Sequence, residues 1–421
     1  MSAPEMISMG CRLNIAESEA LQQNLAASNI DSEHLIIVNS CAVTNEAVRQ
    51  TRQAIRKAKK ANPDKQIIVT GCAAQVDPAM FAAMPETSAV VGNIDKYDAA
   101  NFKLGIQSNR SDIRVSDIMQ ITETAPHMVS AFGERSRAFV EIQNGCDHRC
   151  TFCIIPYGRG NSRSVPAGLV VDQVQALVEK GFREVVLTGV DVTSYGPDLP
   201  GAPTLGMLVE RILKHVPDLP RLRLSSLDGI EIDDRLFDLL TGEARMMPHV
   251  HLSLQSGDNM ILKRMKRRHS REQAIDLVAR LKAKRPDIVI GADIIAGFPT
   301  ETAAMFANSL AIIDQCEIVH GHIFPYSPKQ GTPAAKMPQL EGGVIKERAK
   351  ILRNAVSRRA DAWRETLIGS RQNILAEMSG NGGYAENFAR VLFDTPADKR
   401  QIVPVEITGV QNKQLIGRIA V

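Results

Sequence analysis

The sequence predicts an α/β protein with three parts: an amino-terminal parallel α/β domain, a partial parallel barrel of six β/α units, and a small carboxyl-terminal β-barrel. Three observations support this fold class. Apolar strand-like runs alternate with helical periods over most of the chain, which is typical of parallel sheets covered by helices. The alternation stops between residues 105 and 136. The last part of the chain contains only short strand-like runs, separated by Gly, Asn and Asp.

The amino-terminal domain is expected to span residues 1–104. Two helical periods alternate there with two buried strand-like runs, at residues 17–28, 34–40, 45–62 and 66–71. This order is the rhythm of parallel βα units. Residues 105–136 lack the rhythm and are predicted to form a linker.

The predicted barrel spans residues 137–368 and ends with a charged helix at 343–368. Strand-like runs separated by helical segments occur at residues 138–142, 184–188, 221–225, 250–254, 288–295 and 321–324. Parallel β/α barrels carry their functional residues at the carboxyl ends of the strands. Residues 369–421 are predicted to form the small β-barrel.

Composition places the chain among ordinary soluble globular proteins, with 421 residues, 44% hydrophobic and 23% charged. No apolar run is long enough to cross a bilayer, and the first residues lack a secretory signal pattern. We therefore expect a cytoplasmic protein with no membrane partner. In that compartment grouped cysteines indicate metal binding or catalysis more often than disulfides, and the seven cysteines are an odd number.

The stretch QNGCDHRCTFC follows the first barrel strand and contains Cys146, Cys150 and Cys153. Thiolates select zinc, copper(I) or iron–sulfur clusters. A structural zinc site usually has four ligands in two paired arms, and no second pair follows here. His148 is a possible fourth ligand, but its place beside Arg149 favours a solvated loop residue. Three thiolates on a [4Fe–4S] cluster leave one iron open to a cofactor or substrate.

Three more cysteines, Cys11, Cys41 and Cys72, each stand just past a short apolar strand, 30 and 31 residues apart. The ends of parallel strands meet at one edge of a sheet, so these thiols are predicted to converge there and to form a second metal site. The alternative is three buried cysteines acting as small hydrophobic residues.

The Cys-x3-Cys-x2-Cys spacing after a first barrel strand resembles the radical S-adenosylmethionine (SAM) enzymes. The resemblance implies a partial (β/α)6 radical SAM barrel, in which SAM binds the open iron and is cleaved to a 5′-deoxyadenosyl radical. It also implies cofactor contacts at the strand ends, although Asp228-Gly229 stands where the family often has Glu-Pro. The candidate contacts are Phe152, Gly189, Ser226, Gln255, Asp293 and Gly297.

Essentially the whole chain is similar to the methylthiotransferases, a radical SAM subgroup with an amino-terminal three-cysteine domain and a carboxyl-terminal TRAM-like β-barrel. The stretches MGCRLNIAESE, VTGCAAQ, FPYSPKQGTPAAKM and GYAENFARVLF carry this similarity. CAVTNEAVRQTRQAIRK resembles the branch that modifies threonylcarbamoyladenosine in tRNA, because Val43-Thr44-Asn45 departs from the Cys-x-Val-Arg-Glu pattern of the isopentenyladenosine branch.

This resemblance implies two [4Fe–4S] clusters and SAM as both methyl donor and radical source. The radical would remove hydrogen from C2 of the adenine, and methylated sulfur would replace it. It implies the tRNA anticodon loop as a partner and an electron donor such as flavodoxin or ferredoxin, and it leaves the sulfur donor unknown. Two alternatives stay open: the same chemistry on isopentenyladenosine or on a ribosomal-protein aspartate, and a non-catalytic RNA-binding protein whose cysteines hold zinc.

Three basic runs are candidates for phosphate contacts, which would position an RNA without reading its sequence. Solvated helix faces are an equally good explanation of such runs. The runs lie at residues 49–60, 263–268 and 346–359.

Overall fold

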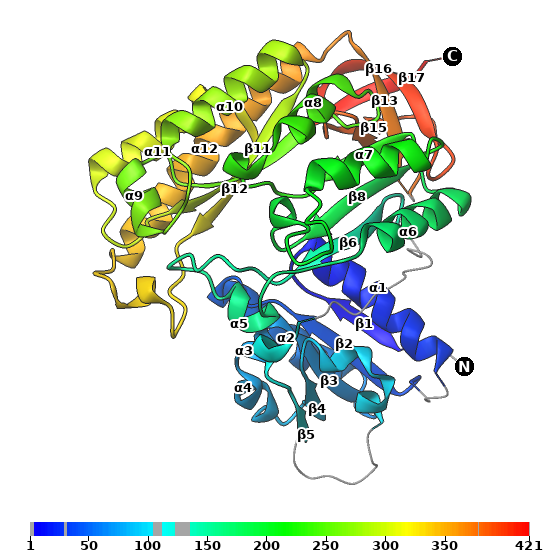
Figure 1. The fold of residues 1–421 in the computed structure, drawn as a ribbon, viewed down its shortest axis with the longest axis vertical. Coiled ribbons are helices and arrows are strands. Elements are labelled where there is room, and N and C mark those ends of the chain that lie inside the picture. The colour runs from blue at the N-terminus through cyan, green and yellow to red at the C-terminus, as the bar shows by residue number, and fades with distance from the viewer. Residues whose placement is uncertain (1–3, 29–31, 104–111, 123–134, 378, 421) are drawn as a thin grey trace.

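The structure is a computed structural model that describes residues 4–28, 32–103, 112–122, 135–377 and 379–420. Figure 1 shows the amino-terminal domain in blue to cyan, a half-barrel from green to orange, and a small barrel in red. The predicted α/β class with these three parts is confirmed. Over these ranges, no helix combines the length and the apolar character that crossing a bilayer requires.

The amino-terminal sheet has five strands in the order β1-β2-β3-β4-β5, and every neighbouring pair is parallel. The run LIIVNS forms β2, whose six residues are all buried, as expected for a parallel strand covered on both faces. The elements are β1 (Glu5–Ser8), α1 (Arg12–Ala27), β2 (Leu35–Ser40), α2 (Asn45–Ala61), β3 (Gln66–Gly71), α3 (Cys72–Val76), α4 (Pro78–Ala82), β4 (Ala89–Val91), β5 (Asp112–Arg114) and 3-10 turns at Asp95–Tyr97, Ala99–Phe102 and Ile118–Gln120.

Strand β5 lies inside the predicted linker and corrects that prediction for residues 112–114, which belong to the sheet. The strand has three residues with exposed or half-buried side chains, so it has no hydrophobic alternation to reveal it. The rest of the predicted linker falls partly outside the described residues, at 105–111 and 123–134.

The six predicted barrel strands are all present and parallel, and form two sheets, β7-β6-β8-β9 and β10-β11-β12. A bridge between Leu227 and Leu252 connects the two sheets. The short β7, antiparallel to β6, was not predicted. The elements are β6 (Ala138–Asn144), α5 (Ile155–Arg159), β7 (Arg163–Ser164), α6 (Ala167–Glu179), β8 (Glu184–Gly189), α7 (Leu205–His215), β9 (Arg221–Leu224), α8 (Asp234–Gly242), β10 (His249–Gln255), α9 (Asn259–Arg264), α10 (Arg271–Lys284), β11 (Val289–Ala296), α11 (Ala303–Gln315), β12 (Ile318–Pro325), α12 (Gly342–Thr366) and 3-10 turns at Val192–Ser194, Gly229–Glu231 and Pro333–Lys336.

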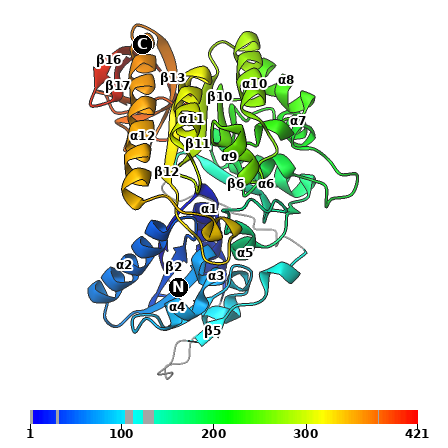
Figure 2. The same ribbon diagram turned by 90° about the vertical axis from the view of Figure 1, so that its left-hand side faces the viewer.

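The main hydrophobic core lies between the barrel strands and their helices. Leu222 and Leu224 of β9 belong to it, so the alternate residues Arg221 and Arg223 face the opposite, inner side of the strand. Helix α1 of the amino-terminal domain packs against β6 and contributes Ala16 to the same core. Figures 1 and 2 both show α1 between the amino-terminal sheet and β6.

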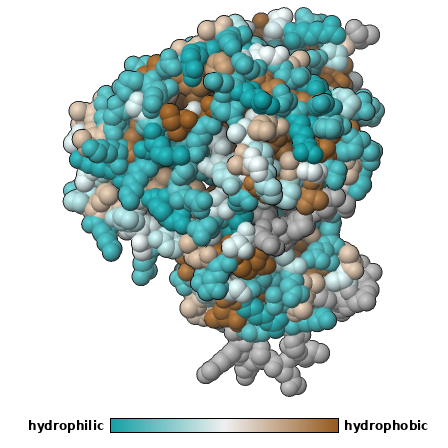
Figure 3. All heavy atoms as spheres, viewed as in Figure 1, coloured by the Kyte–Doolittle hydropathy of each residue, from teal (hydrophilic) through white to brown (hydrophobic). Residues whose placement is uncertain are grey.

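The carboxyl-terminal barrel is closed, in the order β13-β14-β15-β17-β16. Trp363 and Leu367 at the end of α12 pack against its core. The sequence did not predict β14, because its Gly-Gly pair is atypical of a strand. The strands are β13 (Arg371–Ala376), β14 (Gly382–Ala385), β15 (Arg390–Phe393), β16 (Ile402–Gln411) and β17 (Gln414–Ile419). The face seen in Figure 3 is largely hydrophilic over the half-barrel.

Candidate active site

The barrel cysteines lie in the loop between β6 and α5, and all three thiols are free of disulfides. The amide of Cys153 donates to the carbonyl of Cys150 at 3.0 Å, and the amide of Cys146 donates to Gly160 at 3.1 Å. Gly145 has a φ of +72°, and a Cβ there would lie 1.8 Å from the carbonyl oxygen of Asn161. The loop therefore folds back on the Gly-Arg-Gly turn that follows it.

The charges around these thiols fit a metal group. Burial raises the pKa of the Cys153 thiol to about 12, and burial with Asp191 nearby raises the pKa of Cys146 further. A bound metal reverses this preference, because it favours the thiolate. Arg267 Nη1 lies 3.7 Å from Cys150 Sγ, where it would balance thiolate charge. Three soft donors on one short loop suit an iron–sulfur cluster with one open iron.

His148 points at carboxylates, which corrects the expectation that it is a solvated loop residue. Its Nε2 lies 3.0 Å from Asp191 and 3.6 Å from Glu231. Hydrogen bonds that His148 donates to these two carboxylates raise its pKa to about 10. Because Nε2 of His148 bonds to the carboxylates of Asp191 and Glu231, this nitrogen is not available as a fourth ligand beside the thiols.

The three amino-terminal cysteines follow the carboxyl ends of β1, β2 and β3 and so lie along one edge of the sheet, while their convergence on one metal stays a prediction. Cys11 precedes α1, Cys41 follows β2, and Cys72 opens α3 directly after β3. A Cβ on Gly10 would lie 2.9 Å from Cys41 Sγ, so the backbone next to Cys11 passes close to the second thiol. Burial, with a contribution from Cys72, raises the pKa of Cys41 to about 11. These three soft donors also fit a metal group.

Arg159, from the turn after the barrel loop, joins the two cysteine sites. It is buried, and its Nε lies 3.1 Å from Cys72 Sγ. Its other nitrogens contact Glu17 at 2.7 Å and Asn14 Oδ1 at 2.7 Å, and Cys11 Sγ lies 3.6 Å from the same Asn14 oxygen. The preceding Gly158 packs against Cys72, where an added Cβ would be 3.3 Å from the cysteine Cβ.

The buried Lys96, Arg159 and Glu17 and the half-buried Glu141 bring two cations and two carboxylates to this junction. Lys96 Nζ lies 2.9 Å from Glu17, and together with Arg159 it keeps the pKa of Glu17 low although burial opposes this. Glu141 of β6 accepts a hydrogen bond from Asn144 at 2.7 Å. Burial and the nearby Glu17 raise the pKa of Glu141 to about 7.

The predicted cofactor contacts at the ends of β6, β8 and β10 lie on the same side of the half-barrel as the cysteine loop. Gly189 ends β8 against Gln143, and a Cβ there would be 2.6 Å from the Gln143 carbonyl. Ser226 is half-buried in the segment after β9. Gln255 ends β10 with a φ of +66°. Phe152 packs edge-on against Phe298 at 6.3 Å.

The other two predicted contacts have partners within the protein. Asp293 Oδ1 lies 2.9 Å from His251 Nε2 and 3.1 Å from His322 Nδ1. Gly297 has a φ of +73°, and a Cβ there would be 2.8 Å from Ile345 of α12. Helix packing therefore accounts for this glycine, and its predicted cofactor contact stays a prediction.

Sequence reasoning did not identify His251, His322 or Arg267. The signal was present for the histidines, which recur with a period of two in HVHLSL and HGHIF and so share one strand face. Arg267 belongs to a basic run expected to face RNA, yet it contacts Cys150 and donates to Asp228 at 2.8 Å. Among the described residues, the His, Cys, Asp and Glu groups whose ligand atoms all lie within 4.8 Å of one another are His251-Asp293-His322 and His148-Asp191-Glu231, and neither cysteine set is as close as this.

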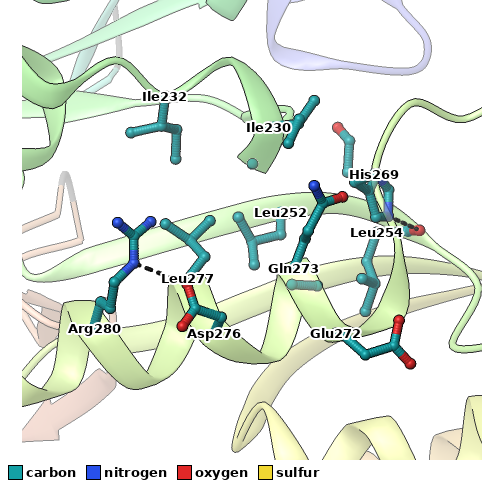
Figure 4. A pocket seen from close by; sticks show the side chains of 13 residues that line it. Ile230, Ile232, Leu252, Leu254, His269, Glu272, Gln273, Asp276, Leu277 and Arg280 are labelled. Carbon is teal, nitrogen blue, oxygen red and sulfur yellow. Dashed lines mark hydrogen bonds and ion pairs between the residues drawn. The ribbon is translucent and has the colours of Figure 1, made fainter.

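A pocket of about 450 Å³ lies between β10, α10 and the turn at Gly229–Glu231. Figure 4 shows that Ile230, Leu252 and Leu277 give it an apolar wall, while Gln273 and Arg280 line it from α10. None of the six predicted cysteine ligands lines this pocket.

Comparison with known proteins identifies two regions of the chain. The Radical SAM superfamily matches residues 140–313, and "Uncharacterized protein family UPF0004" matches residues 5–92. Among solved structures, the radical S-adenosylmethionine methyltransferase TsrM from Kitasatospora setae is similar in fold. Its TM-score is 0.50 at 17% identity, over 75% of this chain and 66% of that one.

Full-length relatives identify the subgroup. The chain is 52% identical to the threonylcarbamoyladenosine tRNA methylthiotransferase MtaB of Rickettsia prowazekii, over 97% of this chain and 95% of the relative. It is 33% identical to the protein of the same name from Bacillus subtilis, over 95% and 92%. A tRNA-2-methylthio-N(6)-dimethylallyladenosine synthase of Erythrobacter litoralis is 31% identical, over 98% and 96%. The predicted resemblance is thus confirmed, and the chain belongs to the MtaB-type threonylcarbamoyladenosine tRNA methylthiotransferases, a family of radical SAM enzymes.

Proposed function

We propose that this chain replaces the C2 hydrogen of N6-threonylcarbamoyladenosine, next to the anticodon of tRNA, with a methylthio group. The observation that carries the proposal is that Gly158 and Arg159, in the short helix after the barrel cysteine loop, contact Cys72 of the amino-terminal site. The contact supports placing the substrate adenine between the two sets of thiols. The choice of nucleoside is supported by the 52% identity to a relative with this name, against 31% for the dimethylallyladenosine synthase.

We further propose that each cysteine set holds one [4Fe–4S] cluster, with Cys146, Cys150 and Cys153 on the barrel loop and Cys11, Cys41 and Cys72 on the sheet edge. When bound, the barrel cluster with SAM supplies the radical chemistry that opens an aromatic C–H bond, which acid–base groups cannot do. Arg267 balances the charge of the barrel thiolates and is itself held by Asp228.

The strand-end residues would form the SAM site beside the barrel loop. Gly189 lets the backbone approach the cofactor, because its position leaves no room for a Cβ next to Gln143. Phe152 offers an aromatic face, and Ser226 and Gln255 offer polar groups at neighbouring strand ends. Gly297 stays in this set as a prediction, whereas the histidine contacts of Asp293 favour a role toward the substrate.

The RNA would present its modified base from a loop, because a paired base hides C2 in the stack. The basic run on α2 is largely exposed and suits phosphate contacts. In the second run, Arg264 and Arg267 bond to Thr300 and Asp228 inside the protein. We therefore expect this run to make fewer phosphate contacts than the run on α2. The small carboxyl-terminal barrel is a further candidate for holding the RNA. A flavodoxin or ferredoxin would supply the electrons.

The test is mass spectrometry of tRNA nucleosides from a strain that lacks the gene. We expect the methylthio form of threonylcarbamoyladenosine to disappear and its unmethylthiolated precursor to accumulate. Persistence of the methylthio form, with no second gene to explain it, would overturn the proposal. Protein purified without air should contain about eight iron and eight sulfide per chain. Colourless, zinc-loaded protein would instead support the non-catalytic RNA-binding alternative.

A further inference from the structure

The inner face of the half-barrel carries a layer of polar side chains that the cluster chemistry does not use. His251 of β10, Asp293 of β11 and His322 of β12 form this layer, with both histidines on one carboxylate oxygen. The strand register places Asp293 directly beside His322. Gly291 makes room for the His251 ring, since a Cβ there would lie 2.4 Å from Nδ1. The layer remains accessible, because the side chains of Asp293 and His322 are 19% and 63% exposed.

This layer lies next to the barrel cysteine loop. The backbone carbonyl of Ser253, two residues beyond His251 on β10, accepts a hydrogen bond at 2.9 Å from Arg267. The same guanidinium lies 3.7 Å from Cys150 Sγ. On β11, Ile295 is two residues beyond Asp293 and packs in one cluster with Phe152 of the loop. The polar layer is therefore about one side-chain layer away from the barrel cysteines.

A second group of charges extends from the amino-terminal cysteine site. Arg12 directly follows Cys11, and its guanidinium lies 5.4 Å from the centre of the Phe388 ring. The guanidiniums of Arg137 and Arg223 lie 5.2 and 4.8 Å from the same ring. Phe388 stacks on His249 at 5.0 Å, so this cationic group adjoins the histidine-bearing strand.

The cationic group has more positive than negative charge. Arg221 and Arg223 share Glu184, and Arg221 also lies 3.8 Å from Glu386. Arg12 and Arg137 have no ion pair with any carboxylate in the ranges that the structure describes. Nη1 of both Arg137 and Arg223 is buried there without a hydrogen-bond acceptor. Four guanidiniums that share the two carboxylates of Glu184 and Glu386 keep an excess of positive charge, and an anionic ligand would lower the cost of burying it.

We propose that this inner face binds the N6 substituent of the substrate adenosine, with Arg12 attracting its carboxylate and Asp293 and His322 bonding its hydroxyl and urea groups. This inference rests on the proposed function, which requires C2 of the base to lie between the two cysteine sites. A threonylcarbamoyl group carries a carboxylate, a hydroxyl and a urea, whereas an isopentenyl group carries no polar atom. Arg12, Asp293 and His322 are thus specificity-determining residues.

An isopentenyl group on this face would cover Arg12 and Asp293 without bonding to them. Sites built to bond polar substrate groups reject analogues that lack those groups by about 10⁴-fold. The inner face would therefore discriminate between threonylcarbamoyladenosine and dimethylallyladenosine, the nucleosides that appear in the names of the two kinds of relatives.

The experiment uses the reconstituted full-length enzyme and three anticodon stem-loop RNAs, which carry threonylcarbamoyladenosine, isopentenyladenosine or unmodified adenosine. We measure KM and kcat for methylthiolation, equilibrium binding of each RNA without air, and SAM cleavage without RNA. For Arg12→Met we expect KM for the threonylcarbamoyl RNA to rise about 10- to 100-fold, the effect of losing one charged hydrogen bond. For His322→Phe we expect the preference over the isopentenyl RNA to fall by about tenfold.

Arg280→Met is the matched control, because Arg280 is exposed on α10, where it pairs with Asp276 of the same helix and lies over the ring of Phe237, away from the inner face. It should leave both RNAs unaffected, and all variants should keep wild-type iron content and SAM cleavage. If the wild type modifies none of the RNAs, the proposed function fails. If it modifies the threonylcarbamoyl RNA while Arg12→Met and His322→Phe keep the full preference, only this inference fails. A third metal that is lost in His322→Phe would also overturn it, since the layer would then be a metal site.

Discussion

The barrel cysteines come from one loop, whereas the amino-terminal cysteines come from the ends of three separate strands. The barrel loop can form its ligand set as soon as β6 and the Gly-Arg-Gly turn are in place. The amino-terminal set exists only when β1, β2 and β3 pair in parallel. Arg159 belongs to the first region but completes the second, through its contact with Cys72. The comparison shows that a local motif and an assembled one are connected by the segment after the barrel loop, in which the buried side chain of Arg159 bonds to Cys72.

The largest effect should come from removing each cysteine set in turn. Replacing Cys146, Cys150 and Cys153 by Ala should reduce SAM cleavage to background and stop product formation. Replacing Cys11, Cys41 and Cys72 by Ala should stop product formation but leave SAM cleavage measurable, because the barrel loop folds without them. Chromatography of 5′-deoxyadenosine and of the modified nucleoside measures both activities. Equal loss of both activities in folded protein would contradict separate roles.

Arg159→Met tests the connection between the two regions. It leaves Glu17 with Lys96 as its remaining ion-pair partner in the described structure and removes the donor to Cys72. Breaking a buried ion pair on one side costs about 3–5 kcal/mol of unfolding free energy. Urea unfolding should show this loss, and iron should be lost mainly from the amino-terminal site. The exposed Arg235 provides a control, Arg235→Met, with little change expected. Wild-type stability of Arg159→Met would show that the two regions do not depend on this contact.

Stability should depend on pH through Glu141, which lies at the junction of the two regions. Its pKa is raised from 4.5 to about 7 by burial and by Glu17. Between these values the unfolded chain releases the proton and the folded chain keeps it, so rising pH favours unfolding by up to about 1.4 kcal/mol per pH unit. Above pH 7 the dependence should level off. Glu141→Gln keeps an acceptor for Asn144 and should flatten the dependence in urea unfolding; an unchanged slope would exclude Glu141 as its cause.

The smallest effect is expected from Gly158→Ala, which tests how closely the regions pack. The new Cβ would lie 3.3 Å from Cys72, closer than ordinary van der Waals contact. Crowding of this kind costs about 1 kcal/mol, the low end for overpacked cores. Gly168→Ala in α6 is the control, since its Cβ would meet no atom within 4 Å and should stabilise the helix slightly. A neutral Gly158→Ala would show that the junction is loosely packed. Thermal unfolding of both variants measures the two changes in stability.

Much of this architecture could be predicted from the sequence, because it depends on local patterns. The six parallel barrel strands are apolar runs, and each of the predicted cysteine ligands follows such a run or lies in one loop. Strands β5 and β14 were missed because an exposed three-residue strand and a Gly-Gly strand carry no pattern. The Arg159 junction and the Asp293 layer depend on contacts between residues far apart in the chain. The sequence features that indicated them were the Gly-Arg-Gly turn for the Arg159 junction and the period-two histidines for the Asp293 layer.

Phe388 lies between β14 and β15, yet it packs beneath strands made much earlier, against His249 and the guanidiniums of Arg12 and Arg223. A ribosome therefore synthesises the cysteine loop and the sheet edge well before the aromatic ring that their arginines surround. Until that ring emerges, these arginines have no aromatic cover, and the nascent chain presents them to any nearby anion, including RNA. The aromatic cover of these arginines is therefore complete only after β14 and β15 have been made.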